Sequence, residues 1–243
     1  REVVPRRFHT RQKNVKELKR VDIFSPVLDL EFNMIKPRLS KHVQYIEWNY
    51  GTAEDDLQQQ VTQQTGMNIL AGNSATESNN HVDLFLQIRD QVDLSRRKVI
   101  VPLSYGSDDY ANKVVTVGKE LLGDAFVPLL DFLPKQKYME ILRSCGFAIM
   151  NHRRQQAVGN VCMAMLMGAR VYLRPENPLT EWIRRRGGVI GNAQKLDMKP
   201  LTSADQRSNQ VLVSSHWGRE QQQARTLKLV HRILGSNGQG SPA

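Results

Sequence analysis

Residues 145–165 have the sequence CGFAIMNHRRQQAVGNVCMAM, in which an apolar run, a polar loop and a second apolar stretch follow one another. The first run, Cys145 to Met150, is short and almost continuously apolar, which is typical of a parallel strand buried on both faces. The second stretch carries its apolar residues at helical spacing, namely at Val158, Val161, Cys162 and Met165. These residues therefore predict a strand, a loop and a helix.

The same succession recurs from Met67 onward. The apolar runs are Met67 to Ala71, Lys98 to Leu103, Ala125 to Leu130, Cys145 to Met150, Ala169 to Leu173 and Gly188 to Ile190. Further apolar stripes at helical spacing lie between them, at Val82, Phe85 and Leu86, at Val114, Val117 and Leu121, and at Tyr138, Ile141 and Leu142. Strands that alternate with helices predict a doubly wound α/β domain with a mainly parallel sheet of about six strands.

Three turn signals agree with this pattern. Pro134 can open a helix at its first position, and Asn177-Pro178 is an N-cap followed by the proline favoured at that position. Gly187-Gly188 would end the same helix. We assign the α/β domain to residues 67–202.

The chain before this domain has a different composition. Residues 1–47 predict one basic helix near Thr10 to Arg20 and strand-like runs at Val21 to Phe24 and His42 to Ile46. Residues 48–66 are polar and rich in glutamine, which is typical of a linker.

The chain after the domain predicts one further helix. Residues 203–234 place Leu227, Val230 and Leu234 on one apolar face. The last residues, 235–243, are rich in glycine and serine and are predicted to be disordered.

The net charge of +10 and the isoelectric point of 9.8 imply an anionic partner. Nucleic acid, an anionic membrane face and a phosphorylated small molecule all fit, and charge does not choose among them. The two cysteines, Cys145 and Cys162, lie in apolar segments without metal-ligand spacing. We find no Walker loop, no Gly-x-Gly-x-x-Gly and no Ser-His-Asp arrangement, which argues against a kinase, a dehydrogenase and a metalloenzyme. No metal site and no cofactor are predicted.

Ligands of an open parallel sheet bind at the carboxyl ends of its strands, so the loops after each run are the candidate sites. After the first run come Gly72-Asn73-Ser74 and then Ser78-Asn79-Asn80-His81. Small residues before a helix N-terminus let backbone N–H groups approach a phosphate. The alternative is an ordinary turn with Ser and Asn as caps.

The loop after the fourth run is the strongest candidate. Arg153, Arg154, Gln155 and Gln156 precede an apolar helix, and forked arginine donors bind diphosphate oxygens. Gly159 would permit close approach of a ligand, and a solvated basic loop is the alternative. Because this loop and the Gly72 loop both follow strands and precede helices, we expect them to lie at the same sheet edge and to face one another across a single cleft.

Two further loops carry weaker signals. Glu176 and Asn177, after the fifth run, either accept hydrogen bonds from sugar hydroxyls or cap the next helix. Tyr105, after the second run, is either a stacking ring or a packing residue. The histidines His81 and His152 lie in these loops, where lone histidines are usually ordinary polar residues.

Four motifs occur in the order and spacing of one known family: Gly72-Asn73-Ser74 with Ser78-Asn79 and His81, Val101-Pro102 with Tyr105, Arg154-Gln155-Gln156 with Gly159, and Glu176-Asn177-Pro178. The chain resembles the dTDP-N-acetylfucosamine:lipid-linked-acceptor N-acetylfucosaminyltransferases of enterobacterial common antigen synthesis. These GT-B enzymes move 4-acetamido-4,6-dideoxygalactose. The likeness covers Met67 to about Ile190, and the chain departs from it at Ala157, often glycine in the family, and at Ala75 to Glu77.

The resemblance implies a GT-B fold, with a Rossmann-like C-terminal donor domain and a truncated remnant of the N-terminal acceptor domain. The expected donor-binding residues are Gly72, Asn73, Ser74, Asn79, His81, Tyr105, Gln155, Gln156, Gly159, Asn160, Glu176 and Asn177. Arg153 or Arg154 would stabilise the leaving nucleotide diphosphate. A catalytic base would come from the missing part, and this fragment alone would bind donor without transferring sugar.

The implied donor is a dTDP-sugar and the implied acceptor a polyprenyl-diphosphate-linked glycan. The protein would lie peripherally on the cytoplasmic face of the bacterial inner membrane, where its positive charge would bind anionic lipid, and nucleic acid would not be a partner. A nucleic-acid-binding α/β module and a sugar-nucleotide epimerase remain the alternatives.

Overall fold

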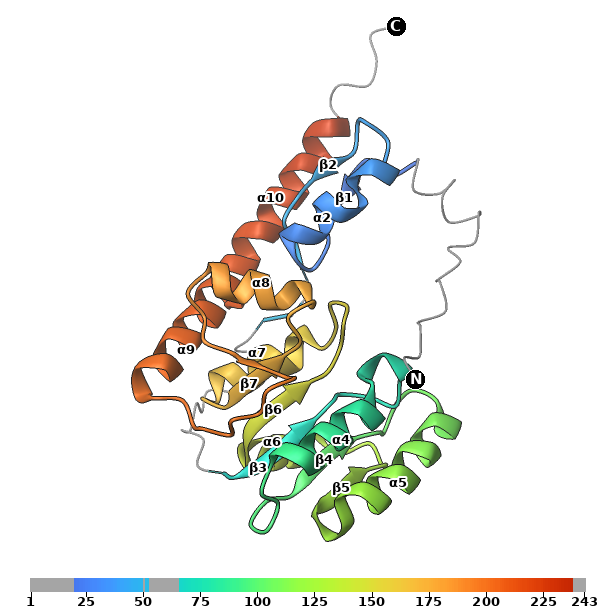
Figure 1. The fold of residues 1–243 in the computed structure, drawn as a ribbon. Coiled ribbons are helices and arrows are strands. Elements are labelled where there is room, and N and C mark those ends of the chain that lie inside the picture. Colours follow the sequence, from blue (N-terminus) through green and yellow to red (C-terminus); the bar gives the residue numbers. More distant parts are fainter. Residues whose placement is uncertain (1–19, 50, 53–65, 238–243) are drawn as a thin grey trace, which may run out of the picture. The chain divides into compact units, whose positions relative to one another are not determined.

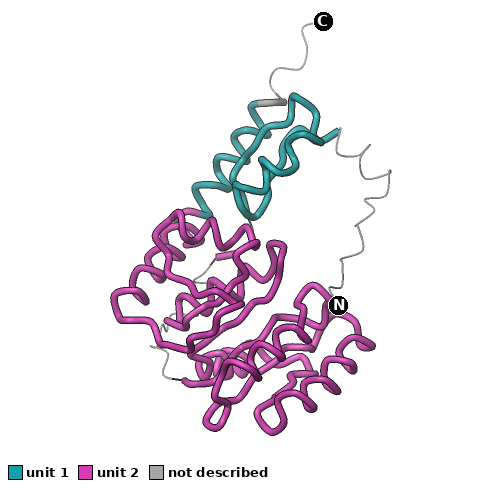
Figure 2. The backbone as a smooth tube through the Cα atoms, in the orientation of Figure 1, with its two compact units in different colours: residues 1–50, 222–243 teal, residues 51–221 magenta. Residues whose placement is uncertain are grey.

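The computed structural model describes residues 20–49, 51–52 and 66–237 (Figure 1). The chain forms two compact units, one of residues 1–50 and 222–243 and one of residues 51–221 (Figure 2). The predicted basic helix near Thr10 to Arg20 and most of the predicted linker lie outside the described residues.

The larger unit is built on one six-stranded sheet in which every pair of neighbouring strands is parallel. The strand order is β5-β4-β3-β6-β7-β8. The strands are β3 (Asn68–Ala71), β4 (Val99–Pro102), β5 (Phe126–Leu129), β6 (Cys145–Met150), β7 (Arg170–Leu173) and β8 (Gly191–Asn192). The predicted α/β domain with a parallel sheet is confirmed, and five of the predicted apolar runs contain its strands.

The last predicted strand, Gly188 to Ile190, is wrong, because that segment has other contacts. The N–H of Gly188 donates to the carbonyl of Ile183 and so completes the end of the preceding helix. The N–H of Val189 donates to the side chain of Asn209 at 2.7 Å. Pairing with β7 therefore begins only at Gly191.

In the described residues of the larger unit, six helices longer than one turn cover the sheet or follow it. They are α4 (His81–Gln91), α5 (Asp108–Leu122), α6 (Lys135–Arg143), α7 (Val158–Leu166), α8 (Pro178–Arg185) and α9 (Ser203–Trp217). Short 3-10 turns, η2 (Glu77–Asn79) and η3 (Gly123–Ala125), precede α4 and follow α5. Strands β4 and β5 extend the sheet on one side of β3, and β6, β7 and β8 extend it on the other. Because crossovers between parallel strands are right-handed, α4 and α5 lie on one face of the sheet and α6 and α7 on the other.

The helix signals in the sequence are largely confirmed. Asn177 is the N-cap of α8, where its side chain accepts the N–H of Leu179, and Pro178 takes the first helical position. Pro134 lies one place earlier than predicted, as the N-cap of α6 rather than its first residue.

The single helix predicted for residues 203–234 is in fact two helices. Gly218 has extended backbone and separates α9 from α10 (Arg219–Asn237), which continues into the segment predicted to be disordered. The buried residues Val213 and Trp217 attach α9 to the larger unit, so that this unit extends past the predicted boundary at residue 202.

The smaller unit contains β1 (Ile23–Phe24), α2 (Asp29–Ile35), η1 (Lys36–Arg38) and β2 (Gln44–Tyr45). The strands β1 and β2 lie within the two predicted strand-like runs, and they pair in parallel. Most of α10 also belongs to this unit, where Arg232 donates to the side chain of Gln44 at 2.8 Å. None of the helices in the described parts of the chain combines the length and the apolar character needed to cross a bilayer.

Candidate functional site

The loop between β3 and α4 folds around the buried side chain of Asn79. Its carbonyl Oδ1 accepts the N–H of Asn73 at 2.9 Å, and its Nδ2 donates to the carbonyl of Ser74 at 2.9 Å. Gly72 has φ +73, and a Cβ there would lie 2.8 Å from Oδ1 of Asn79 and 2.9 Å from Nε2 of His81. Only glycine therefore fits at this turn.

The next loop along the sheet edge, between β4 and α5, is bonded to the first through the backbone. The N–H of Ala75 donates to the carbonyl of Tyr105, and the N–H of Ser107 donates back to the carbonyl of Ala75. Gly106 has φ +123, and a Cβ there would clash with that carbonyl of Ala75. The side chain of Asn73 also donates to the hydroxyl of Tyr105 at 2.9 Å.

The loop between β6 and α7 meets the β3–α4 loop through Gln156. Oε1 of Gln156 accepts the hydroxyl of Ser78 at 2.7 Å, and its Nε2 donates to Oδ1 of Asn73 at 3.0 Å. The two loops therefore lie at one sheet edge, as predicted, and they are in direct contact through Gln156.

The N-terminus of α7 lies where the β3–α4 and β6–α7 loops meet. Its cap residue, Ala157, has φ 60, a left-handed conformation that costs energy in an L-residue and is common at functional sites. Alanine has no polar side-chain atom with which to satisfy the N–H groups of the first turn. A Cβ at Gly159 would meet no atom within 4 Å. Arg153 and Arg154 are exposed beside this turn, and the guanidinium of Arg154 makes two long contacts of 3.4 Å, with the hydroxyl of Ser78 and the carbonyl of Gln155. The uncapped first turn of α7, together with Arg153 and Arg154, is suited to binding an anion, and we call it the anion site.

Two buried histidines lie beneath these loops. Nε2 of His152 is 2.9 Å from Oδ1 of Asn79. Because that oxygen also accepts the N–H of Asn73, we assign the proton of His152 to Nε2. Nδ1 of His81 lies 3.2 Å from the hydroxyl of Tyr110. Burial lowers the pKa of each histidine to about 4, so both rings are neutral at pH 7.

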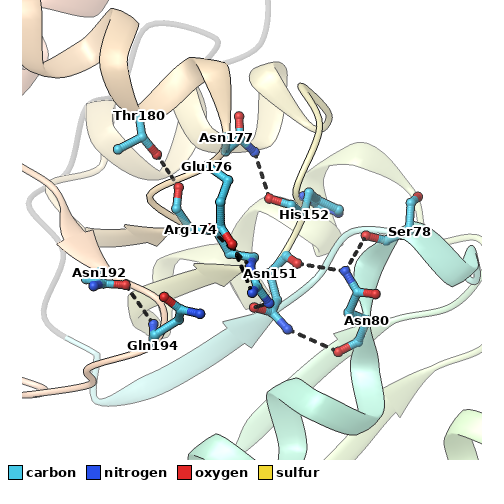
Figure 3. Close-up of polar contacts among 10 residues, drawn as sticks. All are labelled: Ser78, Asn80, Asn151, His152, Arg174, Glu176, Asn177, Thr180, Asn192 and Gln194. Atoms are coloured by element: carbon cyan, nitrogen blue, oxygen red, sulfur yellow. Dashed lines mark hydrogen bonds and ion pairs between the residues drawn. The ribbon is translucent and has the colours of Figure 1, made fainter. Parts of the chain in front are cut away.

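The loop between β7 and α8 adds a carboxylate and a buried arginine (Figure 3). Nη2 of Arg174 lies 3.2 Å from Oε1 of Glu176, and Nη1 of Arg174 donates to Oδ1 of Asn151 at 3.2 Å. The carboxylate is 48 % exposed, so it can accept further hydrogen bonds. Its pKa is held below the ordinary value by a bond from its own backbone N–H, by Arg174 and, at longer range, by Arg153. Asn177 donates to the carbonyls of His152 and Arg154, which ties this loop to the β6–α7 loop.

A cavity of about 270 Å³ lies at the ends of β3, β4 and β5, next to these loops. Its lining residues are Asn73, Pro102, Ser104, Tyr105, Leu129, Asp131, Phe132, Leu133, Lys135, Tyr138 and Asn160. Asn73 and Asn160 belong to the β3–α4 loop and to the first turn of α7. The cavity therefore begins where the anion site ends.

The structure divides the predicted site residues into two groups. Those with exposed or partly exposed groups or with space around them are Tyr105, Arg153, Arg154, Gln155, Gln156, Gly159, Asn160 and Glu176, while Asn73 is buried but lines the cavity. Ser74, Asn79, His81 and Asn177 are buried, and with Gly72 they shape the loops. That all of these residues take part in donor binding stays a prediction. The buried residues of the second group would act on the donor only indirectly, through the shape of the loops.

Sequence reasoning did not select several residues that the structure places in or beside the site, among them Arg174, Asn151, Asp131 and Phe132. Arg174 and Asn151 support Glu176, and Asp131 and Phe132 line the cavity. The only signal for Phe132 is an aromatic residue within a loop that directly follows a strand.

A family model and several solved structures are similar to this chain. The family model described as 4-alpha-L-fucosyltransferase, glycosyl transferase group 56, matches residues 7–215. The chain belongs to this family. The match confirms a glycosyltransferase family of the fucosyltransferase type, as the sequence motifs indicated.

Solved structures show that this fucosyltransferase family member has the GT-B fold. The Anabaena protein HepE in complex with UDP-glucose is 13% identical, with a TM-score of 0.65 over 91% of this chain and 68% of that chain. The trehalose-phosphate synthase of Burkholderia vietnamiensis is 10% identical, with a TM-score of 0.66 over 95% and 64%. The sucrose-phosphate synthase of Thermosynechococcus elongatus is 14% identical, with a TM-score of 0.59 over 93% and 61%. The chain thus spans about two thirds of the length of these proteins.

Proposed function

We propose that the sheet edge described above binds a nucleoside-diphosphate sugar, and that the protein transfers this sugar to a lipid-linked acceptor. The contact between the Gly72 loop and the Arg154 loop through Gln156 carries the proposal. Together with the β7–α8 loop, these two loops bring an uncapped helix N-terminus, two exposed arginines and the exposed carboxylate of Glu176 to one edge of the sheet. A nucleotide sugar needs this combination of cationic and hydroxyl-binding groups. HepE, a structural relative, is solved with UDP-glucose, which supports the same donor class.

The diphosphate would bind at the first turn of α7. The N–H groups there point outward, and the helix dipole favours negative charge. Negative charge grows on the diphosphate as the bond to the sugar breaks. Arg153 and Arg154 can stabilise that charge with forked hydrogen bonds, which lowers the barrier to departure.

Glu176 would hold hydroxyl groups of the donor. A carboxylate held ionised by Arg174 is a strong acceptor, and its pKa lies below the ordinary value. Because Arg174 is itself buried and bonded to Asn151, the carboxylate has a fixed position. Such a group orients the sugar rather than taking part in proton transfer.

The finer identity of the substrates rests on the sequence motifs. The resemblance favours a dTDP-4-acetamido-4,6-dideoxyhexose as donor and a polyprenyl-diphosphate-linked oligosaccharide as acceptor. We place the reaction at the cytoplasmic face of the inner membrane, where the net charge of +10 supports attraction to anionic lipid.

A panel of ligands in a thermal-shift measurement tests the proposal. A ligand that binds the folded state raises the midpoint, by an amount that corresponds to about 2.7 kcal/mol at a hundredfold excess over its dissociation constant. We expect dTDP to raise the midpoint and a DNA duplex to leave it unchanged. A shift with duplex DNA and none with any nucleoside diphosphate would refute the transferase assignment in favour of a nucleic-acid-binding module.

A further inference from the structure

The cavity beside the anion site has an unusual aromatic rim. Phe132 is 87 % exposed and Tyr105 is 57 % exposed, and both line the cavity. An aromatic ring exposed to this extent leaves apolar surface in water, which favours burial against a ligand. The β5–α6 loop that carries Phe132 plays no part in the diphosphate and sugar contacts proposed above.

The position of the cavity restricts what can fill it. Asn73 and Asn160 line the cavity and also belong to the segments that form the anion site. A ligand whose diphosphate lies at the first turn of α7 can therefore extend one of its ends into the cavity. The sugar end is directed toward Glu176 in the proposed arrangement, which leaves the nucleoside end for the cavity.

The cavity wall also offers hydrogen-bonding groups for the edge of a planar ring. Ser104, Asp131 and Lys135 bring a hydroxyl, a carboxylate and an ammonium. Burial raises the pKa of Tyr138 to about 12, so its hydroxyl keeps its proton and can donate. Apolar side chains at Pro102, Leu129 and Leu133 complete the wall.

We propose that this cavity binds the nucleobase of the donor, with Phe132 and Tyr105 as the aromatic surfaces on which the base stacks. This inference rests on the proposed function, and it adds the β5–α6 loop to the donor-binding site. Aromatic stacking contributes enough to base binding that loss of the Phe132 ring would weaken affinity by roughly 10-fold or more.

The test is a calorimetric titration of the full chain with dTDP, with pyrophosphate as a probe that lacks the base. Phe132→Ala should weaken dTDP binding at least about 10-fold and leave pyrophosphate binding unchanged. Phe132→Trp should restore dTDP affinity because it restores the aromatic face. The matched control is Leu130→Ala, since Leu130 is 51 % exposed on the same loop and does not line the cavity.

Each outcome has a separate meaning. If the wild-type chain binds both probes and Phe132→Ala changes neither, the base-binding assignment is wrong while the proposed function stands. If Phe132→Ala leaves dTDP binding intact but reduces sedimentation with phosphatidylglycerol vesicles, Phe132 is a lipid contact and the assignment is again wrong. If the wild-type chain binds neither probe, the proposed function itself fails.

Discussion

Asn80 and Asn151 exchange two hydrogen bonds across the carboxyl edge of the sheet. Nδ2 of Asn80 donates to the carbonyl of Asn151 at 3.0 Å, and Nδ2 of Asn151 donates to the carbonyl of Asn80 at 3.2 Å (Figure 3). The pair fixes the β3–α4 loop against the β6–α7 loop. Oδ1 of Asn151 also accepts from the buried Arg174, so the pair extends to the loop that carries Glu176.

Loss of the Asn151 side chain should therefore destabilise the protein. Asn151→Ala removes one bond to Asn80 and leaves Nη1 of Arg174 buried without that acceptor. We expect the free energy of unfolding to fall by about 1–3 kcal/mol, because a buried N–H that loses its acceptor is costly even though Glu176 still pairs with the guanidinium. Urea denaturation measures this. Asn112→Ala, on an exposed part of α5, should change stability by less than about 0.5 kcal/mol, and an equal effect of the two variants would contradict the account.

The variant Gly159→Ala tests whether a ligand approaches the first turn of α7 without disturbing the fold. A Cβ at this position meets no protein atom, and alanine favours a helix over glycine by up to about 1 kcal/mol. The variant should be at least as stable as wild type yet bind dTDP more weakly, because the new methyl group occupies space kept for the diphosphate. Unchanged affinity in calorimetry would show that no ligand approaches this turn.

Arg154 should contribute to affinity without contributing to folding. Its guanidinium is exposed and makes only long contacts within the protein, at 3.4 Å to Ser78 and to the carbonyl of Gln155. Arg154→Ala should cost about 1.5–3 kcal/mol in dTDP binding, the usual scale for a charge-assisted hydrogen bond. Arg154→Lys should restore little, since an ammonium lacks the planar fork. Lys113→Ala on α5 removes the same charge elsewhere and should leave affinity unchanged.

Stability should depend on pH through His152. The folded-state pKa is about 4 and the unfolded value is near 6.5, so only the unfolded chain takes up this proton between those limits. Stability should therefore fall as the pH drops from 6.5 toward 4, by up to about 1.4 kcal/mol per pH unit for this one group. His152→Gln should flatten the dependence by about that amount in urea denaturation at several pH values. His42→Gln, at an exposed position, is the control, and equal slopes for wild type and His152→Gln would count against the buried neutral ring.

The main elements of the fold could be predicted because their signals are local. The apolar run Cys145 to Met150 and the helical spacing after Val158 are visible in the sequence, and both elements lie where predicted. The weaker signals failed where tertiary contacts decide. Gly188 to Ile190 is apolar enough for a strand, but its backbone completes α8 and binds Asn209 instead.

The candidate site could be predicted only in part, for a related reason. Its loops follow strands, so their positions at one edge come from topology alone. Whether a side chain faces the ligand or the protein depends on neighbours brought in by the fold. Asn79 and His81 were predicted to bind the donor but are buried. Arg174 supports Glu176 and is itself held by Asn151, which lies 23 residues away in the chain.

Hydrogen–deuterium exchange with and without dTDP tests the central claim, that one sheet edge binds the donor, most directly. Backbone amides in the three adjacent loops should gain protection, because ligand contacts close them to solvent and suppress local opening. We predict protection in peptides that cover residues 72–80, 129–138 and 151–160, and unchanged exchange in α9. No protection in these loops at saturating dTDP, or protection confined to α9, would contradict the account.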